Sequence, residues 1–555
     1  MKRKLEKLAN SFYDLVIIGG GIYGACIAWE AARRGLRVCL VEKADFGAAT
    51  SANSLKIIHG GFRYLQHGNL KGMRELIRER RTWMRIAPHL IHPLPVVIPT
   101  YRRWMKEMLS AALLVNDLIG LDRNSGQDPQ KCIPRGKAIS RSECLELLPD
   151  IPREGLTGGA VFYDAQVHNT ERLLLSFLTS ADEMGADVAN YLEVVGILSQ
   201  RNRVCGVEVR DVLTGDRFSI EANAVVNASG PWLDGILGLI QPTPETSTGH
   251  YTKAINLVSR CLFRDCAVGI LGPNGYSDPD RVMPNSGHFL FFAPWRNRSL
   301  MGTRYSPYEG TAEAFEITES DVQIFLDEIN LVHPSAKLTI QDVTFVHGGL
   351  LPSRKSCAGS ATVELAKKWE ILDHRDSGIE GFLSVRGAKY TTARLVAEKV
   401  LDKVLEAKEH KPAEALTSLT SIHGGEIDDF ESFVHAESGK APCGLGKSTV
   451  RRLIYNYGSA YAEVLRYLEM GGERDTGIDD ARVLHAEVIH GVRDEMARKL
   501  SDVVFRRTDL GTVGHPGTEA LGICASAMSA ELGWSADKTR AEIEETTRIF
   551  RIANL

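Results

Sequence analysis

A strand followed by closely spaced glycines near the N-terminus limits what this chain can fold into. The run 15–18 is apolar and β-branched, as expected for a strand buried on both faces. The motif Gly19-x-Gly21-x-x-Gly24 follows, then a small-residue helical stretch over 25–34. A second apolar strand over 37–41 closes on Glu42. This order predicts a βαβ unit that opens a parallel sheet.

Each residue type in this unit has a physical task. Gly19 permits a tight turn, Gly21 lets the backbone approach a pyrophosphate, and Gly24 lets the helix pack closely on the sheet. The unpaired N–H groups at the helix N-terminus would meet the phosphates. Glu42 can accept hydrogen bonds from a ribose diol and would repel a 2′-phosphate, which argues against NADP. The unit therefore predicts a bound dinucleotide.

The rest of the chain favours FAD over NAD. The segment 224–232 is a short apolar strand that ends in a small-residue turn with Gly230, similar to a second strand that passes near FAD in flavoproteins. A generic strand and turn is the alternative for this segment alone. No other complete Gly-x-Gly-x-x-Gly unit is apparent, so a separate NAD(P)H domain is not expected.

Bulk properties exclude several classes of protein. With 555 residues the chain needs two or three domains, and 44% hydrophobic with 25% charged residues is ordinary for a globular protein. The net charge of -4 gives no reason to expect a nucleic-acid partner. The ten cysteines include no Cys-x-x-Cys pair, so we expect no metal site and a reduced, cytoplasmic chain.

One apolar segment leaves two interpretations open. The basic N-terminus is not followed by a signal-peptide core, and no run of about 18 uncharged apolar residues is present. The segment 104–115 is apolar, begins with Trp104 and follows Arg102 and Arg103. It is either a buried helix with a basic flank or a helix that lies in a membrane interface.

Two longer stretches carry a family resemblance. The first runs from Ala49 to Leu65 and contains Thr-Ser, then Lys-x-x-His-Gly-Gly-x-Arg-Tyr-Leu; the second is Val-Arg-Gly-Ala-Lys-Tyr-Thr-Thr-Ala-Arg over 385–394. Together with Tyr-Gly-Ser at 457–459 and Phe-Arg-Arg-Thr-Asp-Leu-Gly at 505–511, they resemble the FAD-dependent glycerol-3-phosphate dehydrogenase family over most of the chain.

The resemblance implies an α/β fold with a Rossmann-like FAD-binding domain, an inserted β-rich substrate domain and a helical C-terminal domain. We place the FAD-binding domain at 12–90, 150–245 and 340–409, the substrate or cap domain at 91–149 and 246–339, and the helical domain at 410–555. Long helical patterns in the tail, over 449–470 and 479–508, indicate a helical cap or a surface for a homodimer. The FAD would be bound non-covalently.

The resemblance also implies a reaction and an electron acceptor. A hydride would pass from C2 of a secondary alcohol to flavin N5, and the electrons would continue to a membrane quinone, or to dioxygen in an oxidase branch. The segment 104–115 corresponds in position to a membrane-associating part of the family. A peripheral location at the inner face of the cytoplasmic membrane is therefore one expectation.

The resemblance suggests which residues contact cofactor and substrate. Arg63 matches a substrate arginine and could hold a phosphate or carboxylate, although a structural ion pair is the alternative. Tyr64 could bind the same group, and Lys389 matches a lysine near the flavin N1–N5 edge, with a surface lysine as the alternative. His59 lies in the His-Gly-Gly turn and is expected to make a non-covalent contact. The expected cofactor contacts are Gly19, Gly21, Gly24, Glu42, Thr50, Ser51, Lys56, His59, Gly60, Gly230 and Thr391.

The substrate side departs from the family pattern. Leu351 stands where the family has the arginine of Gly-Val-Arg-Pro, and Arg354 and Lys355 lie just beyond it. Asn256 stands where the family has a histidine; asparagine can hydrogen-bond a hydroxyl but cannot act as a base near neutral pH. A further family arginine falls near Lys367 or Lys368. We count Asn256 and Arg354 as substrate-binding candidates.

The missing histidine requires another base. His250 and His347 lie near the changed positions in sequence and are candidates, along with Arg63 and Lys389 as catalytic groups. A structural role is the alternative for each histidine.

Three functions remain to be compared. The first is oxidation of glycerol 3-phosphate at the membrane surface. The second is dehydrogenation or oxidation of another small anionic hydroxy or amino substrate, which Leu351 and Asn256 would favour. The third is a flavin-binding protein whose redox state controls assembly rather than turnover, which the anionic-substrate anchors Arg63 and Lys389 argue against.

Overall fold

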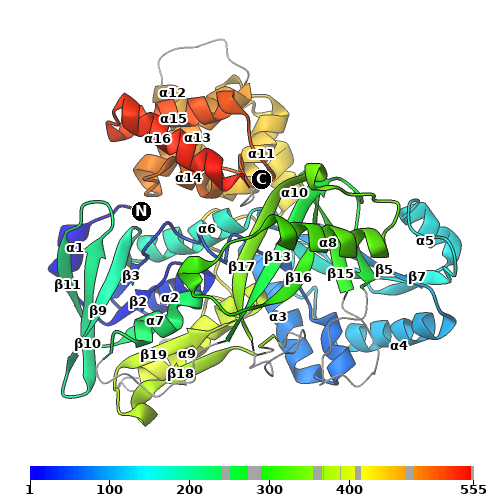
Figure 1. Cartoon of the computed structure of the whole chain (residues 1–555), viewed down its shortest axis with the longest axis horizontal. Helices are drawn as coiled ribbons and strands as arrows, with labels where there is room; N and C mark the ends of the chain where they lie inside the picture. Colours follow the sequence, from blue (N-terminus) through cyan, green and yellow to red (C-terminus); the bar gives the residue numbers. More distant parts are fainter. Residues whose placement is uncertain are drawn as a thin grey trace.

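The computed structural model describes residues 1–240, 250–272, 289–353, 365–366, 368–387, 389–406, 414–470 and 479–551. Side chains are not described at 63, 66, 67, 469–470 and 479–483. Figure 1 shows a cofactor-side sheet at the left, a larger sheet at the right and a cluster of helices that lies over both.

The cofactor-side sheet has the strand order β18-β19-β12-β2-β3-β8. Neighbouring strands from β19 to β8 run parallel, and β18 pairs antiparallel at the edge. Its strands are β2 (Leu15–Ile18), β3 (Val38–Val41), β8 (Asp187–Ala189), β12 (Val225–Asn227), β18 (Glu370–Asp373) and β19 (Phe382–Arg386). Strands from three distant parts of the sequence thus form one mostly parallel sheet.

Helices cover this sheet and build its core. The predicted crossover helix is α2 (Ile22–Arg33), and it contacts α6 (Thr170–Glu183) and α9 (Ala393–Glu406). Trp29 of α2 packs edge-on against Phe177 of α6 at 5.2 Å between ring centroids. A small sheet flanks this unit, in the order β1 (Phe12–Tyr13), β11 (Arg217–Ala222), β10 (Arg203–Asp211) and β9 (Leu192–Gln200).

The larger sheet carries the substrate side. Its order is β17 (Val343–Ser353), β13 (His250–Arg260), β16 (Arg298–Tyr308), β15 (Phe289–Trp295), β14 (Ala267–Leu271), β5 (Ile91–Thr100), β7 (Gly158–Val167) and β4 (Ile57–Ile58). The predicted β-rich region is confirmed. However, β4, β7 and β17 fall in segments that we assigned to the FAD-binding domain. These three strands belong to the larger sheet because each pairs along its length with another strand of it. The sequence of a single strand does not show which strand it pairs with.

Helices flank the larger sheet. They are α3 (Leu70–Ile86), α4 (Arg103–Ile119), α5 (Arg141–Leu147) and α8 (Glu319–Val332). Buried residues of α8, including Phe325 and Leu326, join strand residues such as Ile255 and Phe292 in one apolar core.

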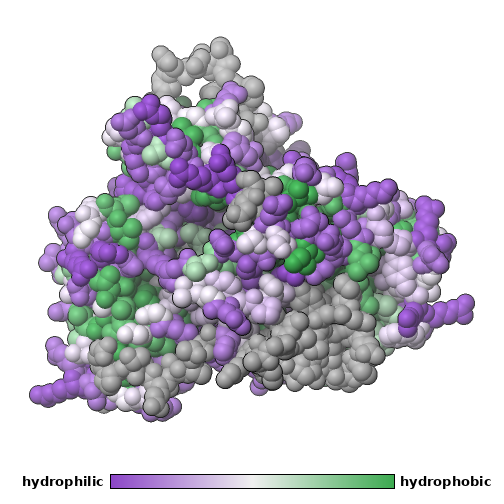
Figure 2. Space-filling model, in the orientation of Figure 1, coloured by the Kyte–Doolittle hydropathy of each residue, from purple (hydrophilic) through white to green (hydrophobic). Residues whose placement is uncertain are grey.

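The C-terminal region is helical, as predicted. Its elements are α10 (Phe430–Gly439), α11 (Lys447–Tyr457), α12 (Tyr461–Met470), α13 (Asp479–Asp494), α14 (Leu500–Asp502), the π-helix η10 (Val503–Arg507), α15 (Thr518–Leu532) and α16 (Ala536–Ile549). In Figure 2, mostly hydrophilic residues cover the visible face of this region, at the top of the view.

The predictions of two long continuous helices in this region, over 449–470 and 479–508, are wrong, because each stretch is divided into shorter helices. The pattern over 449–470 breaks at Gly458, which adopts φ +59°. A Cβ at this position would lie 1.8 Å from the Gly424 carbonyl oxygen, so the two backbones approach too closely for a continuous helix of ordinary residues. The pattern over 479–508 is interrupted between Asp494 and Leu500.

Candidate cofactor and substrate site

The predicted glycine turn lies against the second predicted turn. Gly19 adopts φ +106°, and a Cβ on it would lie 2.7 Å from the carbonyl oxygen of Ala228. A Cβ on Gly24 would lie 1.9 Å from the Gly19 oxygen, so any larger residue there would push α2 away from the turn. Because β2 and β12 are parallel neighbours, Gly230 is brought to the same edge of the sheet. This edge is where open α/β sheets bind ligands.

The N-terminus of α2 and the Glu42 carboxylate face the same turn. Gly21 caps the helix, and the amide of Ile22 donates a hydrogen bond to Ser51 Oγ at 3.0 Å. Glu42 accepts hydrogen bonds from the amides of Gly20 at 2.7 Å and Ala44 at 2.8 Å. Burial raises the pKa of Glu42, and these two amide bonds oppose the shift. The carboxylate is therefore fixed beside the glycine turn.

These residues fit FAD. Added Cβ atoms on Gly19 and Gly24 would collide with neighbouring backbone oxygens, so only glycine allows the tight turn that a pyrophosphate-binding loop of this type needs. Glu42 follows β3, the position from which a carboxylate reaches the adenosine ribose. Ser51 stands at the helix N-terminus, where a hydroxyl can join the phosphate contacts.

The segment 50–61 lies between the cofactor sheet and the larger sheet. Thr50 Oγ1 donates to the Leu350 carbonyl at 3.2 Å, and the His59 amide donates to Thr391 Oγ1 at 3.2 Å. The Gly60 amide donates to Asp164 at 2.6 Å. Three predicted cofactor contacts, Thr50, His59 and Thr391, are thus brought into one strip from distant parts of the chain.

Lys56 differs from the direct cofactor contact that we expected. Its ammonium group is buried, donates to Thr170 Oγ1 at 2.7 Å and pairs with Glu171 at 3.0 Å. Burial lowers the pKa of Lys56, and Glu171 opposes this shift. The geometry therefore gives its charge a partner on α6, and the lysine anchors the 50–61 segment to that helix.

Lys389 and Tyr64 meet at the other end of this strip. Lys389 Nζ donates a hydrogen bond to the Tyr64 hydroxyl and lies 4.4 Å from the centre of its ring. The Tyr23 hydroxyl, on the first turn of α2, donates to the Lys389 carbonyl at 2.9 Å. A residue of the glycine motif thereby holds the backbone that carries Lys389. Arg63 is the neighbour of Tyr64 in chain order, and its side chain lies outside the described set.

One face of the β13–β17 ladder carries the departures from the family pattern. In the antiparallel register, Asn256 lies opposite His347, Ala254 opposite Gly349, and Thr252 opposite Leu351. Directly opposite residues project to the same face of a sheet. A Cβ on Gly349 would lie 3.1 Å from the Thr50 side chain, so this face is directed at the cofactor strip.

Asn53 connects the two candidate polar residues of this face. The Asn256 side-chain amide donates to the Asn53 carbonyl at 3.3 Å, and His347 Nδ1 lies 3.2 Å from Asn53 Oδ1. Thr303 Oγ1 donates to Asn256 Oδ1 at 2.8 Å. Asn256 is therefore held in place, with both ends of its amide occupied by the protein.

The two histidines predicted as bases have different surroundings. His347 is buried, and burial lowers its pKa well below the usual value, so its ring is neutral and weakly basic at pH 7. His250 is exposed at the first residue of β13, four residues and about 13 Å along the strand from Ala254. Of the two, only His347 lies beside Asn256. Arg354 and Lys367 lie outside the described residues, and Lys368 is exposed.

Some residues of this site escaped sequence reasoning. Tyr23 occupies a variable position inside the glycine motif, Asn53 lies within the quoted 49–65 stretch, and Thr303 belongs to no motif. Its place in that stretch was the one sequence feature that could have indicated Asn53. Its two partners, Asn256 of β13 and His347 of β17, are distant in sequence and are brought near only by the tertiary fold.

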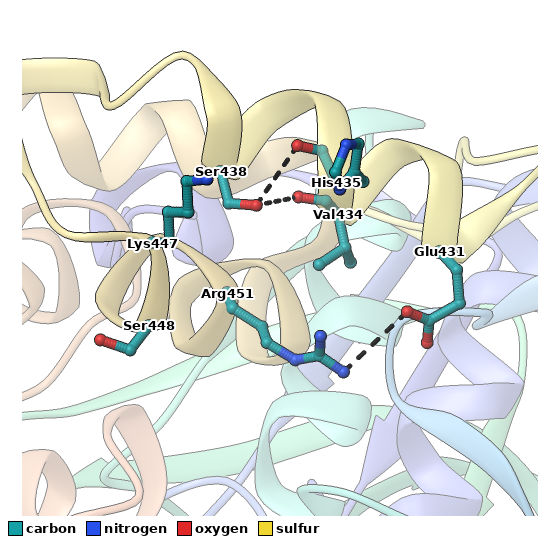
Figure 3. A pocket seen from close by; sticks show the side chains of 7 residues that line it. All are labelled: Glu431, Val434, His435, Ser438, Lys447, Ser448 and Arg451. Carbon is teal, nitrogen blue, oxygen red and sulfur yellow. Dashed lines mark hydrogen bonds and ion pairs between the residues drawn. The ribbon is translucent and has the colours of Figure 1, made fainter.

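A separate cavity lies in the C-terminal region. Its volume is about 300 Å³, and Figure 3 shows that residues of α10 and α11 line it. Arg451 points toward Glu431, with 3.9 Å between the charged groups. It contains none of the predicted site residues.

The fold and the site define a flavin-dependent oxidoreductase. Residues 14–394 match the protein family described as FAD dependent oxidoreductase. Residues 415–539 match the family described as C-terminal domain of alpha-glycerophosphate oxidase. Together these matches confirm the predicted FAD cofactor and the helical C-terminal domain.

Similarity to individual proteins extends over nearly the whole chain. A glycerol-3-phosphate dehydrogenase of Synechocystis is 29% identical, with 98% of this chain and 97% of the relative covered. A probable mitochondrial glycerol-3-phosphate dehydrogenase of Caenorhabditis elegans is 30% identical, with 96% and 72% covered. The structure of the Bacillus halodurans glycerol-3-phosphate dehydrogenase complexed with FAD superposes with a TM-score of 0.76 at 25% identity, covering 98% and 96%. The chain belongs to the FAD-dependent glycerol-3-phosphate dehydrogenase family.

Proposed function

We propose that this protein oxidises glycerol 3-phosphate to dihydroxyacetone phosphate. The observation that carries the proposal is the similarity to glycerol-3-phosphate dehydrogenases over 98% of the chain, on both the cofactor and the substrate side. FAD, when bound, supplies the hydride acceptor at flavin N5. The alcohol loses a hydride from C2 and a proton from its hydroxyl group.

The chain's own residues would bind and orient the substrate. Lys389 is positioned by Tyr23 and Tyr64 to place a positive charge beside the reacting oxygen, where it would lower the cost of removing the hydroxyl proton. We propose Arg63 as the anchor of the phosphate, with Tyr64 as a second contact. The second N–H of the Asn256 amide would donate to a substrate hydroxyl, and His347, which burial keeps neutral, remains the proposed base on the same sheet face.

Uncharged Leu351 weakens one side of this arrangement. Because it replaces the arginine of the family motif, the phosphate would depend more strongly on Arg63 and Lys389. Arg354, just beyond the end of β17, is the remaining proposed phosphate contact.

We propose that the electrons pass to a quinone at a membrane surface, with dioxygen as the other candidate acceptor. Support comes from α4, which buries Leu109 and Leu113 and leaves apolar residues in water. Its exposed fractions are 59% at Trp104, 67% at Leu114 and 66% at Leu118, and Leu121 just beyond it is 75% exposed. A helix that exposes an apolar stripe next to Arg102 and Arg103 is typical of an interfacial helix. No helix in the described ranges is long and apolar enough to cross a bilayer.

Anaerobic bleaching of the flavin tests the substrate. Glycerol 3-phosphate should bleach the flavin, whereas glycerol at the same concentration should not, because it lacks the phosphate that Arg63 and Lys389 would hold. If glycerol 3-phosphate leaves the flavin oxidised while a hydroxy acid or an amino acid bleaches it, the proposed substrate is wrong and another small anionic substrate takes its place.

Co-sedimentation with anionic vesicles tests the membrane surface. The double variant Leu114→Ser with Leu118→Ser should lose most vesicle binding. Leu331→Ser is the matched control, because Leu331 of α8 is equally exposed at 66% but lies away from the apolar stripe. Equal binding by the parent and the double variant would refute an interfacial role of α4.

A further inference from the structure

The loop after β3 contains a buried carboxylate that the cofactor contacts do not explain. Asp45 is 1% exposed and lies three residues beyond Glu42. Its oxygens accept hydrogen bonds from Arg507 at 2.7 and 2.8 Å, from Arg506 at 2.5 Å and from Asn190 at 2.9 Å. Two arginines of the C-terminal domain therefore converge on one residue of the cofactor-binding domain.

The loop that carries Asp45 also holds the cofactor-facing groups. The Ala44 amide donates to the Glu42 carboxylate at 2.8 Å, and the Gly47 amide donates to the Gly20 carbonyl at 3.0 Å. Phe46 fills the space beside Gly20, where an added Cβ would lie 2.7 Å from its ring. Because Ala44 and Gly47 lie one and two residues from Asp45, a displacement of Asp45 would shift their hydrogen bonds to Glu42 and Gly20, and with them the carboxylate and the glycine turn.

The arginines are themselves fixed on the C-terminal side. Both belong to the π-helix η10, an irregular turn of a kind found frequently at functional sites. Arg507 also donates to the Glu495 carbonyl at 3.0 and 2.8 Å. Arg506 donates to Asp502 at 2.7 Å, and Asp502 accepts from the Tyr191 hydroxyl at 2.7 Å. Two cations thus face two buried carboxylates, and the bidentate geometry of Arg507 fixes direction as well as charge.

Charge balance keeps this arrangement ionised. Burial alone would raise the pKa of Asp45, but Arg507 and Arg506 hold it well below its usual range. Removal of one arginine would leave a buried carboxylate undercompensated, so the loop would move toward water.

We propose that Arg506 and Arg507 are positioning residues for FAD: the C-terminal domain clamps the 43–48 loop through Asp45 and so sets the position of Glu42 and the glycine turn. This inference rests on FAD binding and does not depend on the identity of the substrate. It gives the helical domain a part in the cofactor site, beyond a cap or an oligomer surface.

The test measures FAD binding and loop protection in the full-length chain. FAD is removed, its rebinding is followed by quenching of flavin fluorescence, and amide hydrogen exchange of residues 43–48 is measured in the FAD-free protein. Arg507→Met should raise the Kd for FAD at least tenfold and speed exchange of the loop at least tenfold. Arg507→Lys keeps the charge but not two parallel bonds, so its Kd should lie between those of the parent and the methionine variant.

Arg296→Met is the matched control. Arg296, whose side chain is 11% exposed, likewise ties another part of the chain to the C-terminal domain, through the Asp509 carbonyl at 3.1 Å and Thr512 at 2.9 Å. It does not touch the 43–48 loop in the described contacts, so Arg296→Met should change the Kd for FAD by less than twofold.

Two results would overturn the proposal. One is FAD binding by Arg507→Met within twofold of the parent; the other is an equal loss in Arg296→Met, which would mean that domain docking alone matters. If Arg507→Met does not fold, as judged by circular dichroism, Asp45→Asn and Arg507→Lys decide the question, with a threefold rise in Kd expected and no rise contradicting it. Neither readout uses turnover, so failure here leaves the proposed substrate unaffected.

Discussion

The ammonium group of Lys389 donates a hydrogen bond to the hydroxyl of Tyr64, across 325 residues of sequence. The contact joins the N-cap of the short helix η7 (Tyr390–Thr392), which precedes α9, to the short helix η1 (Phe62–His67), which follows the His-Gly-Gly turn. Tyr23 holds the Lys389 backbone from the glycine motif. Groups from three distant segments therefore meet where the sheets adjoin. Because Tyr23 and Tyr64 hold Lys389 in place, substitutions of the lysine and of its partners can test its role in the reaction.

Lys389→Met should slow flavin reduction by glycerol 3-phosphate about a hundredfold or more while FAD stays bound, because removing one group that stabilises the negative charge developing on the reacting oxygen costs about 10²–10³-fold in rate. Tyr64→Phe removes only the hydroxyl that orients the lysine and should cost less. Lys399→Met, at an exposed lysine of α9, is the control and should leave the rate unchanged. Stopped-flow reduction measures all three, and a normal rate in Lys389→Met would remove this lysine from the chemistry.

Leu351→Arg restores a cation at the position where the family has its arginine. Since Leu351 lies on the same sheet face as Asn256, the new guanidinium should reach the anionic end of the substrate. A charge-assisted hydrogen bond is worth about 1.5–3 kcal/mol, so the half-saturating concentration of glycerol 3-phosphate should fall by at least about tenfold. Leu351→Gln, with similar size and no charge, should change it little. Equal values for both variants would place the phosphate elsewhere.

Gly24→Ala should prevent FAD binding. The added methyl group would lie 1.9 Å from the Gly19 oxygen, so α2 or the turn must shift. Gly235→Ala is the control: its Cβ would meet no described atom within 4 Å, and alanine in the helix α7 (Leu233–Leu237) should stabilise the protein by about 0.5–1 kcal/mol. Flavin content after purification and thermal unfolding report both effects. A fully loaded Gly24→Ala protein would show that the turn tolerates a side chain.

The cofactor half of the site could be predicted from sequence because its signals are local. Gly19, Gly21, Gly24 and Glu42 stand at fixed spacings around one strand and one helix, and the structure has the strand, turn and helix that these spacings predict. The two stretches that carry the family resemblance, 49–65 and 385–394, also indicated Thr50, His59 and Thr391 as candidates. The sequence does not show that His59 and Thr391 are hydrogen-bonded to each other.

The substrate half depends on pairing between distant strands, which local patterns do not encode. That Asn256 faces His347 follows from the register of β13 with β17, and a slip of one residue would turn one of them to the other face. The ion pair of Lys56 was missed for a similar reason: its partner Glu171 lies on α6, far away in sequence. The C-terminal helices were overextended because a helical pattern does not reveal that Gly458 must approach Gly424.

The last prediction concerns how the free energy of unfolding depends on pH, and it rests on a buried lysine between the larger sheet and the C-terminal helices. Lys131 is 4% exposed; it donates to the carbonyls of Pro88 and Ile91, the latter at 3.1 Å, and lies 3.1 Å from His92 Nδ1. Burial lowers its pKa to about 7, and Asp128 and Glu431 oppose the shift only in part.

The sign of the pH effect follows from the proton count. Between pH 7 and about 10.5, the ordinary value for lysine, the unfolded chain keeps this proton while the folded protein has released it, so the free energy of unfolding rises with pH. The slope is at most about 1.4 kcal/mol per pH unit. Lys131→Met abolishes this contribution, so the parent should gain about 2 kcal/mol relative to the variant between pH 7 and pH 9. Urea unfolding at the two pH values measures the difference, with exposed Lys399→Met expected to follow the parent. A Lys131→Met protein whose stability changes with pH in parallel with the parent would show that Lys131 keeps its proton in the folded state.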